Sequence, residues 1–205
     1  MTRFWVVAFY VAAGAVGAGV SLALGRSPFE TRAWLGTTGL VAMILSAGLG
    51  VLVGATTVAA TRVLVRRTRW VRALHDDLRP VVRGADDGTL LVLALASGVG
   101  EELLFRGLLT PLIGVVASSI AFGLLHQVRG RARWGWMAWA VVMGAVFALV
   151  LELTGSLLGA IVAHVYINGC NLRFLRDNDL APRSTRSLGG LLDRGAAKRD
   201  PGGRY

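Results

Sequence analysis

The chain of 205 residues has the length of one ordinary domain, and its composition excludes most soluble classes. Hydrophobic residues make up 54% of it and 27 glycines add to them, so about two-thirds of the chain is apolar, where globular domains average about 45–50%. Charged residues account for 17%, against about 25% in soluble domains. This combination excludes a disordered chain and is typical of a membrane protein.

The net charge of +10 comes almost entirely from arginine, because Lys198 is the only lysine among 22 basic residues. The arginines occur in bursts between apolar runs, so we expect them to orient the chain and to bind anionic lipid headgroups, with no nucleic-acid partner. Cys170 is the only cysteine, which excludes an internal disulfide and a cysteine-based metal cluster.

Six apolar stretches lack Asp, Glu, Lys and Arg, and a membrane-spanning helix needs about 20 such residues. The stretches are Phe4–Gly25, Ala33–Thr61, Gly88–Gly100, Gly107–Val128, Trp134–Leu151 and Leu153–Leu172. The third and fourth are separated only by Glu101–Arg106, and together they allow two helices with a break. We place this break between Thr110 and Gly114, where Thr110 can cap a helix and Pro111 can take its first position. The predicted fold is all-α, a polytopic integral membrane bundle of about six transmembrane helices.

Arginine-rich loops stay in the cytoplasm, which sets the expected orientation. Seven arginines lie in Arg62–Arg83, three in Arg129–Arg133 and eight basic residues from Arg173 onward, against two in Arg26–Arg32. Six helices with both termini in the cytoplasm place the three basic segments on that side. We therefore predict a multi-pass protein of the cytoplasmic membrane.

Shorter segments complete this organisation. The first apolar run could be a secretory signal, but its length of about 20 residues favours a retained helix. Apolar residues spaced through 71–81 predict a short amphipathic cytoplasmic helix on the membrane surface. The tryptophans at 134, 136 and 139 are interpreted as an interfacial belt. We expect one membrane-embedded domain at 1–172 and a basic, mobile cytoplasmic tail at 173–205.

Ionisable residues inside membrane spans are costly, by about 2.5–3.5 kcal/mol each, and are usually functional. Glu102 and Arg106 are four residues apart on one helix face, which predicts a structural ion pair. Glu101 is rotated by about 100° on an ideal helix and lacks that partner. It is therefore available as a general base.

Histidines add a second set of polar groups in the apolar runs. His126 ends the fourth run, while His164 and Asn168 share one face of the sixth. Neutral imidazoles bind zinc, and a carboxylate can take a proton from an activated water. The HExxH arrangement of soluble metalloproteases is absent, so such a site has to be assembled between helices.

These residues form three motifs that resemble one family, the intramembrane CAAX-processing and bacteriocin-processing (Abi) proteases, which include the Ras-converting endopeptidase. The motifs are EExxxR at Glu101–Arg106, FxxxH at Phe122–His126 and HxxxN at His164–Asn168. Each is short, but three in this order within apolar helices are specific. The resemblance covers about residues 88–172.

The resemblance implies a role for each motif residue. Glu101 would activate the water, and His126 and His164 would hold a metal or position that water. Asn168 would stabilise the oxyanion or complete the polar cluster. The remaining pair, Glu102 and Arg106, would hold the helix in place.

Two mechanisms stay open at this point. Zinc could be held by His126, His164 and Glu101, in which case Glu102 could be the base or a ligand. A metal-independent glutamate mechanism is the alternative. The expected position of Glu101 near mid-membrane and of His126 near the cytoplasmic edge requires either that the fourth helix continues past His126 or that a water-filled cavity opens from the cytoplasm. Glycines 100, 107, 123 and 169 would allow close helix packing around such a cavity.

The favoured function is an intramembrane endopeptidase acting on a membrane-associated protein or peptide. A non-catalytic scaffold or bacteriocin-immunity protein of the same family is the alternative, and an ion-coupled transporter is a third possibility because intramembrane Glu and His residues are also typical of one. The sequence specifies neither the cleavage sequence nor the oligomeric state.

Overall fold

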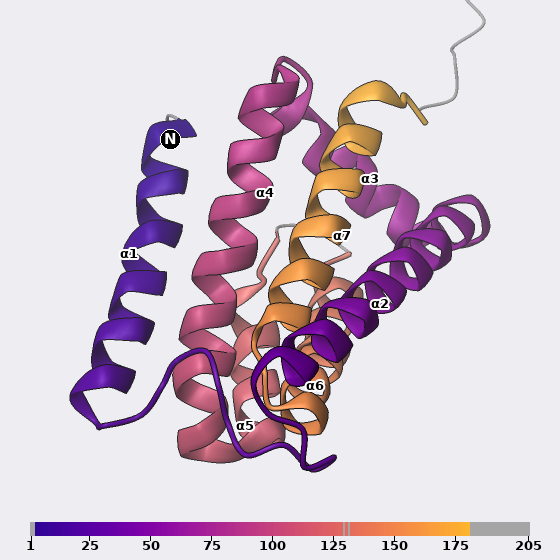
Figure 1. Cartoon of the computed structure of the whole chain (residues 1–205). Helices are drawn as coiled ribbons and strands as arrows, with labels where there is room; N and C mark the ends of the chain where they lie inside the picture. The colour runs from indigo at the N-terminus through magenta and orange to yellow at the C-terminus, as the bar shows by residue number, and fades with distance from the viewer. Residues whose placement is uncertain (1–2, 129, 131, 181–205) are drawn as a thin grey trace, which may run out of the picture.

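The chain folds into a bundle of helices in the computed structural model, which describes residues 3–128, 130 and 132–180 (Figure 1). In chain order the elements are α1 (Arg3–Ala23), α2 (Gly39–Arg67), α3 (Arg69–Val82), α4 (Asp87–Glu102), the π-helical segment η1 (Leu103–Leu109), α5 (Thr110–Leu125), α6 (Arg133–Thr154) and α7 (Leu158–Asp177). Within these ranges there is no strand, only a single β-bridge between Glu30 and Ser156. The predicted all-α fold is confirmed. Residues 181–205 of the predicted tail lie outside the described ranges.

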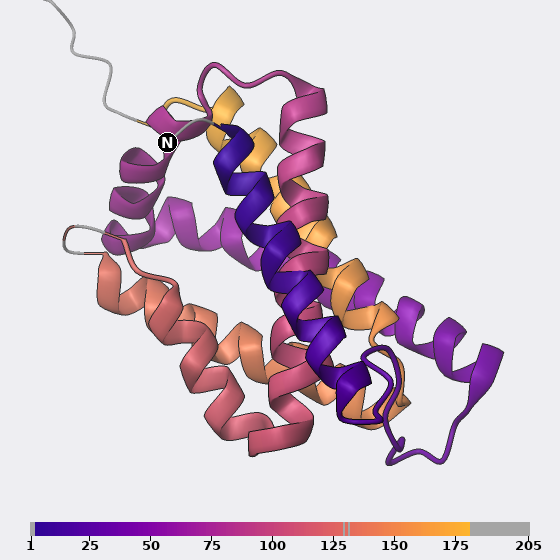
Figure 2. The same ribbon diagram turned by 90° about the vertical axis from the view of Figure 1, so that its left-hand side faces the viewer.

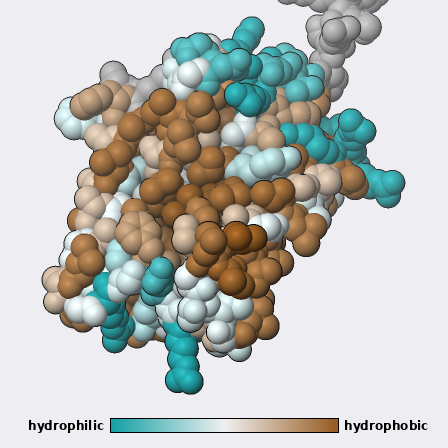
Figure 3. Space-filling model, in the orientation of Figure 1, coloured by the Kyte–Doolittle hydropathy of each residue, from teal (hydrophilic) through white to brown (hydrophobic). Residues whose placement is uncertain are grey.

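Four helical stretches are long and apolar enough to cross a membrane. They are Phe4–Ala23, Gly39–Arg67, Asp87–Leu125 and Arg133–Thr154. The third contains α4, η1 and α5. Helix α7, expected as a further span, is not among the four, and it carries polar residues such as His164 and Asn168 along its length. Apolar side chains cover the middle of the face seen in Figure 3, and hydrophilic ones gather toward its upper and lower ends. Such an apolar exterior fits a membrane-embedded bundle.

The third stretch reverses direction at Gly114. The backbone there has φ 81° and ψ 167°, a conformation that glycine adopts without steric cost. The predicted break between Thr110 and Gly114 is therefore confirmed, but the predicted cap is wrong. Thr110 has helical backbone angles that continue η1, and its hydroxyl forms a 2.9 Å hydrogen bond with that of Ser118. The reversal returns α5 against η1 and α6.

Helix α1 lies along α4 and η1, with its backbone in direct contact with theirs (Figure 2). A Cβ atom on Gly14 would lie 3.0 Å from the Cα atom of Gly100, and one on Gly17 would lie 2.7 Å from the backbone of Leu104. These glycines let two helices approach more closely than side chains would allow. Helix α1 is thus packed into the bundle, which supports its interpretation as a retained helix.

Three of the four glycines expected around a cavity do make close contacts. A Cβ atom on Gly100 would collide with the carbonyl oxygen of Tyr10. Those on Gly107 and Gly123 would lie 2.7 and 2.8 Å from carbonyl oxygens of the α1–α2 connection and of α6. Gly169 differs, because its Cβ would make only an ordinary contact of 3.9 Å.

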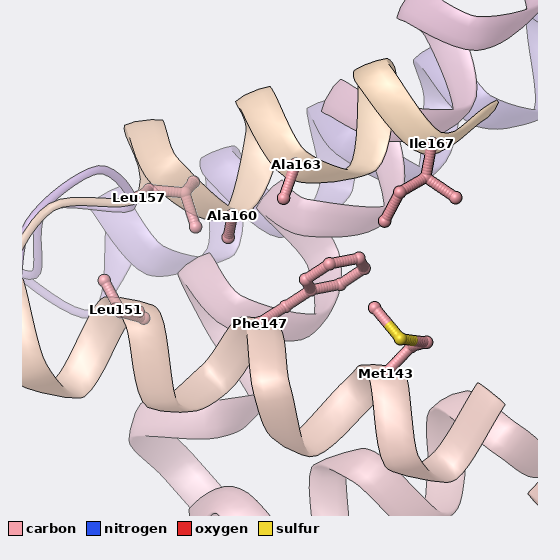
Figure 4. Packing of buried hydrophobic residues seen from close by; sticks show 7 residues of the cluster. All are labelled: Met143, Phe147, Leu151, Leu157, Ala160, Ala163 and Ile167. Carbon is pink, nitrogen blue, oxygen red and sulfur yellow. The ribbon is translucent and has the colours of Figure 1, made fainter. Parts of the chain in front are cut away.

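The largest apolar cluster joins α6 and α7 (Figure 4). Its buried members are Met143, Phe147, Leu151, Leu157, Ala160, Ala163 and Ile167. Small residues on α7 face larger ones on α6, and Figure 4 shows the Phe147 ring pointing toward α7 between them. This packing places His164, which follows Ala163 on α7, at the centre of the bundle.

Helix α3 is the expected amphipathic helix, but its apolar side packs on the protein. Leu74 and Val82 are buried against the bundle, whereas Val81 is 74% exposed. The helix contacts α2, α6 and α7. The bundle therefore buries most of the apolar side of α3. Contact of this helix with the membrane surface remains a prediction.

Candidate active site

Two helix ends and one helix face bring four polar side chains together. Glu101 and Glu102 lie at the end of α4, His126 directly follows α5, and His164 lies on α7. The Oε2 atom of Glu101 is 3.7 Å from Nε2 of His126 and 3.6 Å from Nε2 of His164. The Oε1 atom of Glu102 is 2.7 Å from Nδ1 of His164. Residues 62 positions apart in the chain are thus in hydrogen-bond contact.

The expected pair of Glu102 and Arg106 is present and fully buried. Their side chains are 0% and 1% exposed, and Nη1 of Arg106 lies 3.1 Å from Oε1 of Glu102. Nη2 of Arg106 donates to the carbonyl oxygen of Gly144 on α6 at 2.9 Å, and the guanidinium lies 4.3 Å from the centre of the Phe122 ring. Buried charges are tolerated when they are paired and hydrogen-bonded in this way. The pair therefore ties α4 and η1 to α5 and α6.

The helix changes its winding directly after the two acids. The π-helical segment η1 begins at Leu103 and contains Arg106. Single π-helical turns are frequent at functional sites, because they displace side chains from their α-helical positions. The spacing of the motif residues gives no sign of this departure from an ideal α-helix. Glu101 still points away from the ion pair, since its nearest polar partners are the two histidines.

The hydrogen bonds of the two imidazoles assign their tautomers. Nδ1 of His126 lies 2.7 Å from the carbonyl oxygen of Phe122, which can only accept, so Nδ1 carries the proton. Nδ1 of His164 likewise donates to the carboxylate of Glu102, which also accepts from Arg106. In a neutral imidazole the other nitrogen is an acceptor. Both Nε2 atoms therefore direct lone pairs toward Glu101.

The Oε2 atom of Glu101 is buried and has no hydrogen-bond partner among the described residues. Two acceptor nitrogens thus lie 3.6–3.7 Å from the same acceptor oxygen. Buried acceptors normally have a donor, and this group calls for a donor or a cation between its members. A water molecule has two protons, so it can donate to two of the three acceptors at a time.

A cavity of about 340 Å³ reaches this carboxylate. It is lined by Phe9, Tyr10 and Ala13 of α1, Glu101 of α4, Leu104 and Phe105 of η1, Leu125, His126 and Gln127 at the end of α5, and Trp136 of α6. The alternative that the fourth helix continues past His126 is wrong, because α5 ends at Leu125 and His126 has φ −84° and ψ 60°. A cavity explains how water reaches a carboxylate in an apolar bundle. Its opening toward the cytoplasm remains a prediction.

Asn168 joins the cluster one helical turn after His164. Its Nδ2 atom donates to the hydroxyl of Ser97 at 2.9 Å. Ser97 precedes Glu101 by one turn of α4, so the contact connects α7 to the helix that carries the base. Both roles considered for Asn168 remain predictions. Ser97 was missed from the sequence, because a serine in an apolar helix most often bonds only its own backbone, as Ser97 also does with Leu93.

Aromatic rings hold both imidazoles. The Phe147 ring stacks on His164 at 5.2 Å between centres, and Phe122 lies 4.2 Å from His126. Trp136 contacts His126 edge-on at 5.8 Å and lines the cavity. The reversal at Gly114 thus brings His126 against the start of α6, and the assignment of Trp136 to an interfacial belt remains a prediction. In the sequence, nothing distinguishes Phe147 from an ordinary core residue.

The cluster has the donor types of a zinc site, but its spacing is wider. Zinc ligands at about 2.0–2.1 Å in a tetrahedron lie about 3.3–3.4 Å from one another. The two distances from Glu101 are 3.7 and 3.6 Å. Among the described residues, no group of three or more His, Cys, Asp and Glu side chains is arranged to hold a metal ion. The residue types therefore suit zinc, and the distances from Glu101 are about 0.3 Å wider than those of a closed tetrahedral site.

Comparison with known proteins supports the family resemblance over the part of the chain that carries this cluster. Residues 88–170 match the family described as type II CAAX prenyl endopeptidase Rce1-like, which is a protease family. The uncharacterized protein YpbD of Bacillus subtilis (strain 168) is 32% identical over 88 residues, covering 42% of this chain and 46% of that protein. The chain thus matches about half the length of this relative. No solved structure matches at a significant level. The resemblance drawn from the three motifs is confirmed for residues 88–170.

Proposed function

We propose that the chain is an intramembrane endopeptidase that hydrolyses a peptide bond of a membrane-associated protein or peptide. One observation carries the proposal: the buried Oε2 of Glu101, without a hydrogen-bond partner, faces the Nε2 atoms of His126 and His164 at the wall of a cavity. This arrangement suits a water that donates to Glu101 and to one of the two imidazoles and is ready to lose a proton. The match of residues 88–170 to a protease family points to the same chemistry.

In the proposed reaction, Glu101 acts as the general base. It takes a proton from the water as the water oxygen attacks the carbonyl carbon of the scissile bond. The tetrahedral intermediate then breaks its C–N bond, and the proton held by Glu101 passes to the leaving amine. His126 and His164 orient the water through their Nε2 atoms, while their Nδ1 atoms are engaged with Phe122 and Glu102. Glu102 and Arg106 position His164 and the end of α4.

The proposed mechanism requires no metal. Purified protein is expected to contain substoichiometric zinc, and its peptidase activity is expected to survive incubation with a strong chelator, because the distances from Glu101 to the two histidine nitrogens exceed those between zinc ligands. Elemental analysis combined with activity after chelation measures both. One zinc per chain, with activity lost on chelation and restored by zinc, would contradict this mechanism and favour zinc held by the two histidines and Glu101.

We further propose that the protein lies in the cytoplasmic membrane with both termini in the cytoplasm. The start of α1, helix α3, the start of α4 and the end of α7 lie at one end of the bundle (Figures 1 and 2). That end includes the arginine-rich segment from Arg62 to Arg83, which is expected to face the cytoplasm and its anionic lipid headgroups. Its substrates would then be proteins or peptides associated with the same membrane.

The experiment that tests the proposed activity compares protein termini in membranes. Cells carrying the unaltered chain are expected to contain new N-termini that are absent with Glu101→Ala, His126→Ala or His164→Ala. Each variant is expected to be inserted at the normal level, which immunoblotting of the membrane fraction measures. If the same termini persist with all three variants, the peptidase is contradicted. A non-catalytic scaffold, which needs the helices but not these side chains, would then explain the chain better.

A further inference from the structure

We propose that Tyr10, contributed by α1, is a catalytic residue that donates a hydrogen bond to the oxyanion formed during peptide hydrolysis. The inference rests on the proposed peptidase function and adds a residue that lies outside the family match, which begins at residue 88. The observation behind it is that Tyr10 lines the same cavity as Glu101 and His126. Helix α1 would thereby supply part of the active site.

The position of Tyr10 relative to Glu101 is set by backbone contact. The carbonyl oxygen of Tyr10 lies so close to Gly100 that a Cβ atom there would collide with it. Gly14, one turn further along α1, also meets Gly100. Since Gly100 directly precedes Glu101, the two helices are held together at the level of the proposed base. Tyr10 and Glu101 therefore lie at the same level of the bundle, and both line the cavity.

Peptide hydrolysis by an activated water needs such a donor. The carbonyl oxygen gains negative charge as the water attacks, and a donor placed at that oxygen stabilises the transition state. Asn168 is engaged with Ser97, and its side chain is not among those that line the cavity. Nδ1 of His126 already donates a hydrogen bond to the carbonyl oxygen of Phe122.

The cavity wall carries hydrogen-bond donors on Tyr10, Gln127 and Trp136 besides His126. Gln127 donates through Nε2 to the carbonyl oxygen of Leu124 at 3.0 Å. Trp136 also lines a smaller cavity of about 110 Å³ beneath α3. The hydroxyl of Tyr10 takes part in no hydrogen bond with any other described residue, so its proton is available to a substrate.

The step is balanced without a further reactant. The Tyr10 hydroxyl donates a hydrogen bond to the oxyanion and keeps its proton throughout. The proton that Glu101 removes from water goes to the leaving amine, the C–N bond breaks, and the carbonyl re-forms as a carboxylic acid. Tyr10 is therefore expected to act on the transition state more than on substrate binding.

The test measures how fast the new N-termini that require the unaltered chain form after its expression is induced. Tyr10→Phe keeps the ring and removes only the hydroxyl, and we expect it to slow their formation about 100-fold, the cost of losing one oxyanion donor. Purified with one such substrate, it should lower kcat and leave KM nearly unchanged. Tyr166→Phe, which removes a hydroxyl from the exposed side of α7, is the matched control and should form the termini at the wild-type rate.

Two further measurements keep the test decisive. The thermal unfolding temperature of Tyr10→Phe should equal that of the wild type, and a fluorinated tyrosine at position 10, with a more acidic hydroxyl, should shift the alkaline limb of the kcat profile to lower pH. Termini that form at the wild-type rate with Tyr10→Phe, but are lost with Glu101→Gln, would overturn the role of Tyr10 alone. Termini unaffected by Glu101→Gln would overturn the peptidase function and this inference together.

Discussion

Replacing Glu101 by glutamine is expected to abolish measurable cleavage while leaving the fold intact. A general base contributes about 10²–10⁴ to a rate, so the loss should reach about 1,000-fold. The amide keeps the size of the carboxyl group but cannot take the proton from water. The measurement is the rate of appearance of the wild-type-dependent N-termini, with membrane-inserted protein quantified in parallel.

The same substitution should not lower stability. Glu101 directs an acceptor without a hydrogen-bond partner toward the lone pairs of two imidazoles, an arrangement that is unfavourable for the protein alone. The amide of glutamine can donate toward one of those nitrogens and remove this cost. The thermal unfolding temperature in detergent is therefore expected to stay at or above that of the wild type. A variant that unfolds at a clearly lower temperature would mean that Glu101 is structural.

Glu102→Gln distinguishes the structural role of Glu102 from the proposed catalytic role of Glu101. It leaves the buried Arg106 without its ionic partner, so less folded protein is expected, but each folded molecule should retain more activity than Glu101→Gln. Glu152→Gln, at the far end of α6 from Trp136, is the control and should match the wild type in both respects. A folded but inactive Glu102→Gln beside an active Glu101→Gln would exchange the roles of the two acids.

Of all the proposed substitutions, Arg106→Met is expected to lower the free energy of unfolding the most. The guanidinium is the buried cation that pairs with Glu102, and it also bonds Gly144. Removing one partner of a buried ion pair typically costs about 3–5 kcal/mol, because the other charge is left without compensation. Thermal unfolding of the purified protein, or the yield of folded protein where unfolding is complete, measures the effect.

Two comparisons show whether the cause is the unpaired charge. Arg26→Met removes an exposed arginine whose single hydrogen bond reaches the carbonyl of Pro111 at 3.3 Å, and the change is expected to lie within about 0.5 kcal/mol. The double variant Glu102→Gln and Arg106→Met removes both charges and should be more stable than Arg106→Met alone. An Arg106→Met protein that unfolds at the wild-type temperature would show that the pair contributes little.

Local sequence patterns were sufficient to predict the helices and one contact of the site, the pair of Glu102 and Arg106. Apolar runs and arginine bursts predicted the helices, because a segment that long and apolar cannot remain in water. The break between Thr110 and Gly114 was predicted from a threonine and a proline that could begin a new helix. The pair of Glu102 and Arg106 followed from a spacing of four residues on one helix. In each case the responsible interaction lies within one turn or one segment of the chain.

The meeting of Glu101, His126 and His164 was decided by the tertiary structure. Their separation along the chain says nothing about distance until the reversal at Gly114 returns α5 to η1 and packing places α7 beside α4 and α6. The motifs suggested that these residues act together, but not that Nε2 of each imidazole faces one carboxylate oxygen.

The contributions of Ser97, Tyr10 and Trp136 had no local signal at all. A serine, a tyrosine or a tryptophan in an apolar helix has the same pattern whether it faces lipid, core or cavity. The sequence by itself determined which segments are helical, where the charges lie and which acid is paired with Arg106. Only the tertiary structure decided which helix faces enclose the cavity, because helix packing depends on contacts between residues far apart in the chain, such as Tyr10 with Gly100.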